Sequence, residues 1–134
     1  MSTELAVLVA TALLSIVLPV TYVSRLIMLP GGQQWQGGNR EGSFAEEPGW
    51  ITRARKAHSN LVENLVVFAA LVLAAHLSDS LGSMTRIGSI VFFAGRVLHA
   101  IAYTAGLVPW RTVAFFVGLG GTLLVAAPMI PKLF

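Results

Sequence analysis

Residues 5–24 read LAVLVATALLSIVLPVTYVS and contain no charged side chain. A helix needs about 20 predominantly apolar residues to cross the hydrocarbon core of a bilayer, so this stretch is long enough to span a membrane. No Lys or Arg precedes it. The stretch therefore lacks the basic region of a cleavable signal peptide, and we interpret it as a retained span.

Three further apolar runs follow the first one along the chain. Together they predict spans at about residues 5–28, 50–77, 87–108 and 112–131. Only 11% of the 134 residues are charged, whereas roughly 25% is usual for soluble domains. Four spans leave too few residues for an appended soluble catalytic domain. We therefore predict an all-α fold in which residues 1–134 form a single transmembrane domain, a bundle of four helices.

The residue types exclude several kinds of chemistry. The chain has no cysteine, so disulfides, thiolate metal sites and a protein thiol nucleophile are excluded, and any thiol must come with a ligand. His58, His76 and His99 are too far apart in the sequence to form a zinc site, and no HExxH motif occurs, so we expect no metal. The net charge is +3. We interpret the Lys and Arg residues that produce it as residues that set the membrane topology or bind an anion, rather than as a nucleic-acid surface.

The cationic residues lie mostly on one side of the predicted membrane. A polar segment at residues 30–49, which includes GGQQWQGG, is predicted to be a flexible loop, and Pro109 and Trp110 are predicted to mark a tight turn. This side carries Arg25, Arg40, Arg53, Arg55, Lys56 and Arg111, whereas the other side carries only Arg86 and Lys132. The positive-inside rule then predicts that the loop faces the cytoplasm and that both termini lie on the opposite side.

Polar side chains form one stripe on each of two predicted spans. At 100° per residue, one face of the second span, about 100° wide, carries Arg53, Lys56, Asn60, Glu63 and Asn64. On the third span, Arg96, His99 and Tyr103 fall within about 60° of one another. Glu63 and Arg96 come to a similar depth in antiparallel helices, where an unpaired charge costs at least about 2.5 kcal/mol. We therefore predict that these two residues form an ion pair inside the bundle.

Two interpretations of these stripes remain open. A structural clasp between helices needs only one acid and one base. The stripes, with Arg111 at the adjacent turn, instead contain more cationic donors than acidic acceptors. This surplus favours an anionic ligand that carries carboxylates or phosphates and enters from the cytoplasmic side.

Two sequence segments resemble a known family. The run Arg55-Lys-Ala-His-Ser-Asn60-Leu-Val-Glu63-Asn64 resembles the signature helix of the MAPEG family, the membrane-associated proteins of eicosanoid and glutathione metabolism. Gly95-Arg96-Val-Leu-His99-Ala-Ile-Ala-Tyr103, followed by Pro109-Trp110-Arg111, resembles a second segment of that family. The resemblance is greatest to the microsomal glutathione transferase and bacterial branch. It implies a homotrimer of four-helix protomers that holds glutathione between neighbouring subunits at the cytoplasmic side.

The resemblance also implies roles for individual residues. Arg111 matches the catalytic arginine of the family. The positions that match glutathione-contacting or site-lining residues are Arg53, Lys56, His58, Asn60, Glu63, Arg96, His99 and Tyr103. Lys56 stands where the family usually has arginine, and a lysine lacks the bidentate fork that binds a carboxylate. His58 falls on the helical wheel away from the polar stripe, so a contact with a neighbouring helix or subunit is an equal alternative for it.

The mechanism implied by the resemblance is attack by a glutathione thiolate on a lipophilic electrophile or lipid hydroperoxide dissolved in the membrane. A guanidinium beside the sulfur, here that of Arg111, would raise the thiolate fraction of a thiol whose ordinary pKa is about 8.5. The short chain favours a bacterial inner membrane. Two alternatives are another anionic thiol or lipid bound to the same scaffold, and a proton or ion path. Polar residues become sparse beyond Arg96, which favours a half-depth pocket over a path.

Overall fold

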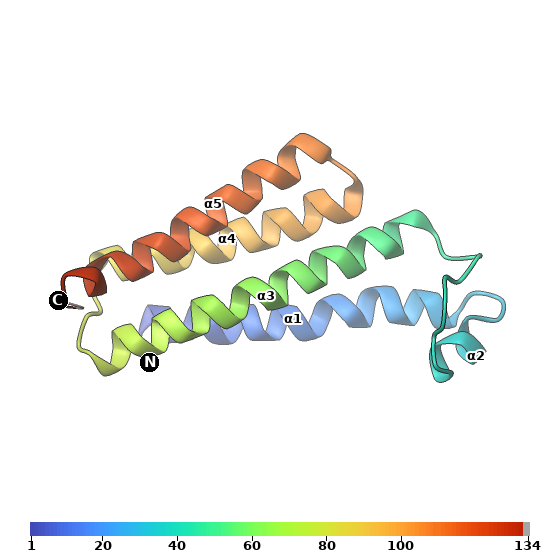
Figure 1. Cartoon of the computed structure of the whole chain (residues 1–134), viewed down its shortest axis with the longest axis horizontal. Helices are drawn as coiled ribbons and strands as arrows, with labels where there is room; N and C mark the ends of the chain where they lie inside the picture. Colours follow the sequence, from blue (N-terminus) through green and yellow to red (C-terminus); the bar gives the residue numbers. More distant parts are fainter. Residues whose placement is uncertain (133–134) are drawn as a thin grey trace.

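Four long helices run side by side in the computed structural model, which describes residues 1–132 (Figure 1). They are α1 (Thr3–Ile27), α3 (Gly49–Leu77), α4 (Ser83–Ala105) and α5 (Val108–Ala126), with a short α2 (Gly32–Gly37) and a final 3-10 turn, η1 (Ala127–Lys132). Four helices, the last of them α5 continued through η1, are long and apolar enough to cross a membrane. The described residues contain no strand. The prediction of an all-α, multi-pass membrane protein is confirmed.

The α1–α3 and α4–α5 connections lie at one end of the bundle, and the α3–α4 turn lies at the other end with the start of α1 (Figure 1). The loop end contains residues 28–48 and the turn between α4 and α5, and the termini end contains the start of α1, the turn between α3 and α4, and η1. At the termini end, Glu4 of α1 is buried and its Oε1 accepts a hydrogen bond from Thr85 Oγ1 of α4 at 2.7 Å. This placement of the two ends agrees with an even number of spans.

The first two predicted spans match α1 and α3 closely, whereas α4 and α5 begin earlier than the predicted residues 87 and 112. The tight turn is formed by Gly106 and Leu107 rather than by Pro109 and Trp110. Gly106 ends α4 in the left-handed region at φ 78, which glycine adopts without steric cost. Pro109 lies in the first turn of α5, where its missing N–H has no helical acceptor to lose.

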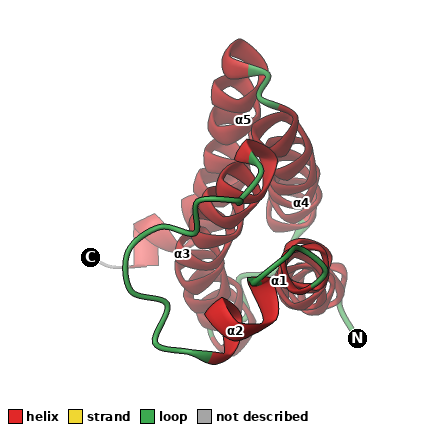
Figure 2. Ribbon diagram, turned by 90° about the vertical axis from the view of Figure 1, so that its right-hand side faces the viewer, coloured by secondary structure: helices red, strands yellow, loops and turns green. Residues whose placement is uncertain are grey.

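The polar segment at residues 30–49 contains a short helix, α2, and so is not wholly the predicted loop. Figure 2, which views the bundle from the loop end, shows α2 beside α1. Trp35 of α2 packs against Phe44 with ring centroids 5.7 Å apart. Both rings cover a buried cluster that includes Tyr22, Leu26 and Ile51. Burial of these aromatic side chains gives the segment an apolar core that its composition did not indicate.

Glycines let α4 and α5 pack closely along their length. Gly95 of α4 faces Gly118 of α5, and a Cβ on Gly95 would lie 2.7 Å from the Gly118 Cα. Gly88 and Gly121 make a similar close approach nearer the termini end. On the other side of α4, Phe92 stacks on Phe68 of α3 with ring centroids 3.9 Å apart. These contacts hold α4 between α3 and α5, so its polar side chains face both neighbours.

Candidate functional site

Arg96 occupies the interior of the bundle near the middle of α4. Only 1% of its surface is exposed. Its Nη1 donates a hydrogen bond to Asn60 Oδ1 of α3 at 3.2 Å, and its Nη2 donates to the Phe115 carbonyl of α5 at 2.8 Å. Its Cζ also lies 5.2 Å from the centroid of the Phe115 ring, within the range of a cation–π contact. Arg96 therefore connects three helices.

The predicted ion pair between Glu63 and Arg96 is wrong. Glu63 is exposed and its Oε1 accepts a hydrogen bond from Ser59 Oγ at 3.1 Å, while the one ion pair within residues 1–132 joins Arg55 to Glu47. Depth was the basis of the prediction, but direction around the helix decides the contact. Glu63 is about 60° around α3 from Asn60, which is the residue that faces α4.

One donor of Arg96 has no acceptor. Its Nε is buried and makes no hydrogen bond to any residue that the structure describes. A guanidinium has five N–H donors, and a buried donor without a partner costs about 1 to 3 kcal/mol. The hydrogen-bonding capacity of this buried cation is therefore not exhausted by the protein around it.

His99, Tyr103 and Arg111 continue from Arg96 toward the loop end. His99 is buried, and its ring meets the Tyr103 ring edge-on with centroids 5.5 Å apart. The Arg111 Cζ lies 4.7 Å from the centroid of the Tyr103 ring. Arg111 is half-buried and has no carboxylate partner in the described part of the chain. The structure thus brings together Arg96, His99, Tyr103 and Arg111, which we call the α4–α5 polar row.

The stripe on α3 divides between this row and the outer surface. Arg53 Nε donates to the Thr104 carbonyl at 3.0 Å, in the last turn of α4, where the helix dipole favours a cation. Asn60 contacts Arg96 as described above. Lys56 and Glu63 are exposed on α3. One protomer therefore brings Arg53 and Asn60 to the row but leaves Lys56 and Glu63 outside it.

His58 does not join the row. It lies on the side of α3 that faces α1, and its Nδ1 is 3.0 Å from the Tyr22 hydroxyl. The two rings are tilted with centroids 6.1 Å apart. The prediction that His58 faces away from the stripe is confirmed, and within this chain it makes a contact between helices.

Sequence reasoning missed the main-chain acceptors and one glycine. The main-chain carbonyls of Thr104 and Phe115 accept hydrogen bonds from Arg53 and Arg96. Every residue has a main-chain carbonyl, so the residue type does not indicate which carbonyl is the acceptor. Gly118 provides the space beside Arg96, because a Cβ there would lie 2.6 Å from the Arg96 Nε. A signal for Gly118 was available, since it follows Arg111 by two helical turns and therefore lies on the same face of α5.

The arrangement is suited to binding an anion. Three arginines contribute, one each from α3, α4 and α5: Arg53, Arg96 and Arg111. Among the described residues 1–132, none of the three forms an ion pair. Neutral amide, carbonyl and aromatic groups hold them in place. Their positive charge is therefore available to a ligand that brings carboxylates or a thiolate.

Comparison with known proteins identifies one family and relatives that share one name. The model of the MAPEG family matches residues 4–129. The chain is 42% identical to microsomal glutathione S-transferase 1 of Rattus norvegicus over 77 residues, which are 57% of this chain and 50% of the relative. It is 37% identical to the protein of the same name from Mus musculus over 90 residues, 66% of this chain and 58% of the relative. The chain thus spans about half the length of these relatives. No solved structure matches it.

Proposed function

Because the chain belongs to the MAPEG family, we propose that it is a glutathione-dependent membrane enzyme in which a bound glutathione thiolate attacks a lipophilic electrophile or hydroperoxide. The observation that carries this proposal is the position of Arg111, held over the Tyr103 ring at 4.7 Å without a carboxylate partner in the described residues. The relatives named above are glutathione transferases, which supports glutathione as the thiol.

Arg111 is the residue that we assign to the sulfur. Free thiols have a pKa of about 8.5 and are mostly protonated at neutral pH. A guanidinium beside the sulfur favours the charged form and so raises the thiolate fraction. The Tyr103 face fixes the guanidinium by a cation–π contact. The thiolate then forms a bond to the electrophilic carbon as the leaving group departs. With a hydroperoxide it attacks the terminal oxygen instead, so that the O–O bond breaks to give glutathione sulfenic acid and an alkoxide that takes up a proton, and a second glutathione reduces the sulfenic acid to glutathione disulfide and water.

The remaining residues of the site position glutathione. Arg53 and Lys56 provide cations for its two carboxylates, and Asn60 provides an amide for its peptide groups. His99 and Tyr103 flank the bound glutathione, and Arg96 holds Asn60 in place through the hydrogen bond at 3.2 Å. Positioning of this kind converts attack on a membrane-dissolved electrophile into a reaction between oriented partners.

The exposed carboxylate of Glu63 supports assembly of several copies. Glu63 lies about 21 Å from the start of α3 at 1.5 Å per residue, near the middle of that helix. A carboxylate facing lipid at this depth costs about 2.5 kcal/mol or more. We propose that a second copy covers this face in a homotrimer, and that Glu63 and the nearby Lys56 bind glutathione between subunits, with Glu63 receiving its ammonium group.

The proposed orientation places the loop end in the cytoplasm. Arg25, Arg40, Arg53, Arg55, Lys56 and Arg111 all lie at this end, which agrees with the positive-inside rule. Glutathione would then enter from the cytoplasm, while the electrophile reaches the site from the bilayer. A bacterial inner membrane is the proposed location.

Two measurements on the detergent-purified protein test this function. Calorimetry measures glutathione binding, and thioether formation with an aromatic chloro-dinitro electrophile measures turnover. We expect Arg111→Ala to bind glutathione but to lose turnover, and Glu63→Gln to lose binding. Arg86→Gln is the matched control, because Arg86 lies at the termini end and should leave both unchanged. Persistent turnover in Arg111→Ala would assign thiolate stabilisation to another residue, and a folded wild type that binds no glutathione would favour another anionic ligand.

A further inference from the structure

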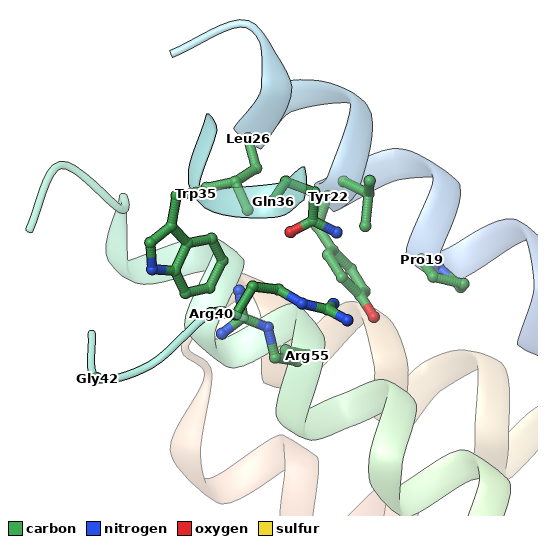
Figure 3. A pocket seen from close by; sticks show the side chains of 9 residues that line it. Pro19, Tyr22, Leu26, Trp35, Gln36, Arg40, Gly42 and Arg55 are labelled. Atoms are coloured by element: carbon green, nitrogen blue, oxygen red, sulfur yellow. The ribbon is translucent and has the colours of Figure 1, made fainter. Parts of the chain in front are cut away.

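Cavities open at both ends of the bundle. The cavity at the loop end, where Arg40 and Arg55 lie beside Tyr22 (Figure 3), adjoins the beginning of α3 on the side that we propose for glutathione. The second cavity has a volume of about 430 Å³ and lies between the start of α1 and the start of α4. We call it the termini-end cavity. Its lining includes Ser2, Glu4, Gly82, Ser83 and Arg86.

The termini-end cavity is remote from the α4–α5 polar row. Arg86 and Tyr103 both belong to α4, and at 1.5 Å per residue they are about 25 Å apart along the helix. Of the described residues that line this cavity, none is assigned to glutathione. Any ligand of the termini-end cavity therefore binds at the opposite face of the membrane from the proposed glutathione site.

Glu4 contributes a buried carboxylate whose visible partner is neutral. It is 4% exposed, and its Oε1 accepts a hydrogen bond from Thr85 Oγ1 at 2.7 Å. Thr85 Oγ1 in turn accepts a hydrogen bond from the Gly82 N–H at 2.8 Å, which fixes the carboxylate against the start of α4. Within residues 1–132 no cation forms an ion pair with Glu4. A carboxylate can accept about four hydrogen bonds, and its burial is costly without a counter-charge, so Glu4 favours a cationic donor.

Arg86 contributes the opposite charge to the same cavity. It lies at the beginning of α4, is exposed, and forms no ion pair in the described part of the chain. The N-cap of α4 is Gly82, which provides no side-chain hydrogen bond to the helix. The first N–H groups of α4 therefore add donors beside Arg86, and helix N-termini bind phosphate groups in this way.

The two charges share one cavity without joining each other. Glu4 and Arg86 both line it, yet the one ion pair among residues 1–132 joins Arg55 to Glu47. A simple anion would be repelled by the carboxylate, and a simple cation by the guanidinium. A ligand with an ammonium group and a phosphate group held apart is complementary to both.

The depth of the cavity identifies the source of such a ligand. Glu4 directly precedes the uncharged run at residues 5–24, and Arg86 directly precedes the uncharged run at residues 87–95. Both charges therefore lie where the hydrocarbon core begins, at the level of lipid headgroups. Next to the cavity on α4, Ile87 and Ile90 are 56% and 52% exposed and lie within about 40° of Ser83 around the helix. Acyl chains can cover these side chains below a headgroup in the cavity.

We propose that the termini-end cavity binds the headgroup of an ethanolamine phospholipid, with its ammonium group at Glu4 and its phosphate at Arg86 and the start of α4. The ammonium group donates hydrogen bonds to the carboxylate. The trimethylammonium group of choline has no N–H, so the buried carboxylate selects ethanolamine over choline. The bound lipid connects the start of α1 to the start of α4.

The test uses the full-length protein, delipidated in detergent, with phosphatidylethanolamine or phosphatidylcholine of the same acyl chains added in mixed micelles. Native mass spectrometry counts bound lipid. We expect wild type to retain phosphatidylethanolamine at least tenfold more than phosphatidylcholine. Glu4→Gln keeps an acceptor for Thr85 but removes the charge, so the ratio should fall to near one. Arg86→Gln should lower retention of both lipids severalfold and keep the ratio, because both lipids carry the phosphate.

Asp79→Asn is the matched control, because Asp79 is exposed at the same end but does not line the cavity. Its φ of 49 is one that asparagine tolerates. This variant should keep the wild-type preference, and Glu4→Gln should bind glutathione as wild type does.

Three results would overturn the proposal: equal retention of the two lipids by wild type, equal loss of preference in Asp79→Asn and Glu4→Gln, or displacement of the lipid by an equal concentration of soluble glycerophosphoethanolamine. The last result would assign the cavity to a soluble zwitterion. If Glu4→Gln does not fold, wild-type retention of both lipids by Arg86→Gln would overturn the proposal as well.

Discussion

Replacing Gly118 with alanine tests the structural basis of the α4–α5 polar row. The added Cβ would lie 2.6 Å from the Arg96 Nε and 2.8 Å from its Cζ. Arg96 cannot swing into open space, because only 1% of its surface is exposed and α4 and α5 already meet backbone to backbone at Gly95 and Gly118. Either the guanidinium leaves its two acceptors or α5 moves away from α4.

The expected loss of stability can be assembled from separate contributions. Overpacking a filled interior costs about 2 kcal/mol, and weakening one hydrogen bond of a buried charged group costs about 2 kcal/mol. Alanine gains about 1 kcal/mol over glycine in helix propensity. The free energy of unfolding should therefore fall by about 3 kcal/mol. At roughly 3 °C per kcal/mol for a chain of this size, the midpoint of thermal unfolding should fall by about 10 °C.

Gly120→Ala provides the matched control, since a Cβ on Gly120 has nothing within 4 Å. This variant should unfold at or slightly above the wild-type temperature. A third measurement uses Arg96→Gln, whose shorter side chain removes the overlap. In that background Gly118→Ala should cost much less than alone, because the two substitutions act on one contact. Equal unfolding temperatures for Gly118→Ala and Gly120→Ala, or additive effects with Arg96→Gln, would refute the assigned contact.

Three further substitutions have distinct expected results. Tyr103→Phe should keep turnover, because the ring alone holds Arg111, whereas Tyr103→Leu should lower kcat about tenfold or more; equal activity of the two variants would contradict the cation–π role. Tyr22→Phe should reduce the free energy of unfolding by about 1 kcal/mol through loss of the His58 contact, with glutathione affinity unchanged by calorimetry; a parallel loss of affinity would place His58 in the site. Lys56→Arg should tighten glutathione binding severalfold because a guanidinium can bind a carboxylate through two hydrogen bonds, and unchanged affinity would remove Lys56 from the carboxylate position.

Features that depend on local spacing could be predicted from the sequence. The uncharged run at residues 5–24 predicted α1, and the spacing of Arg96, His99 and Tyr103 predicted that they share one face of α4, as the structure shows. The wheel position of His58 likewise predicted that it points away from the stripe on α3. In each case the helical period alone decides the result.

Features that depend on contact with another part of the chain could not be predicted in this way. The acceptors of Arg53 and Arg96 are main-chain carbonyls, which every residue carries and no pattern marks. The start of α5 at Val108 depends on the left-handed conformation of Gly106, one glycine among 13 in the chain. The helix α2 forms in a segment rich in glycine and glutamine because Trp35 finds Phe44 and the end of α1 to pack against. Tertiary contacts override composition at each of these places.

The incorrect ion pair bears directly on function. If Glu63 were paired with Arg96, the two charges would cancel at short range and an anion approaching the row would experience little net field. Arg96 is instead held by an amide oxygen, a carbonyl oxygen and two aromatic faces, none of which removes its charge. At an effective dielectric constant of 20, a unit positive charge attracts an anion about 8 Å away by about 2 kcal/mol. Neutral partners thus stabilise the buried cation and preserve this attraction, while Glu63 stays on the outer face of α3, where an ammonium group or a second copy of the chain can meet it.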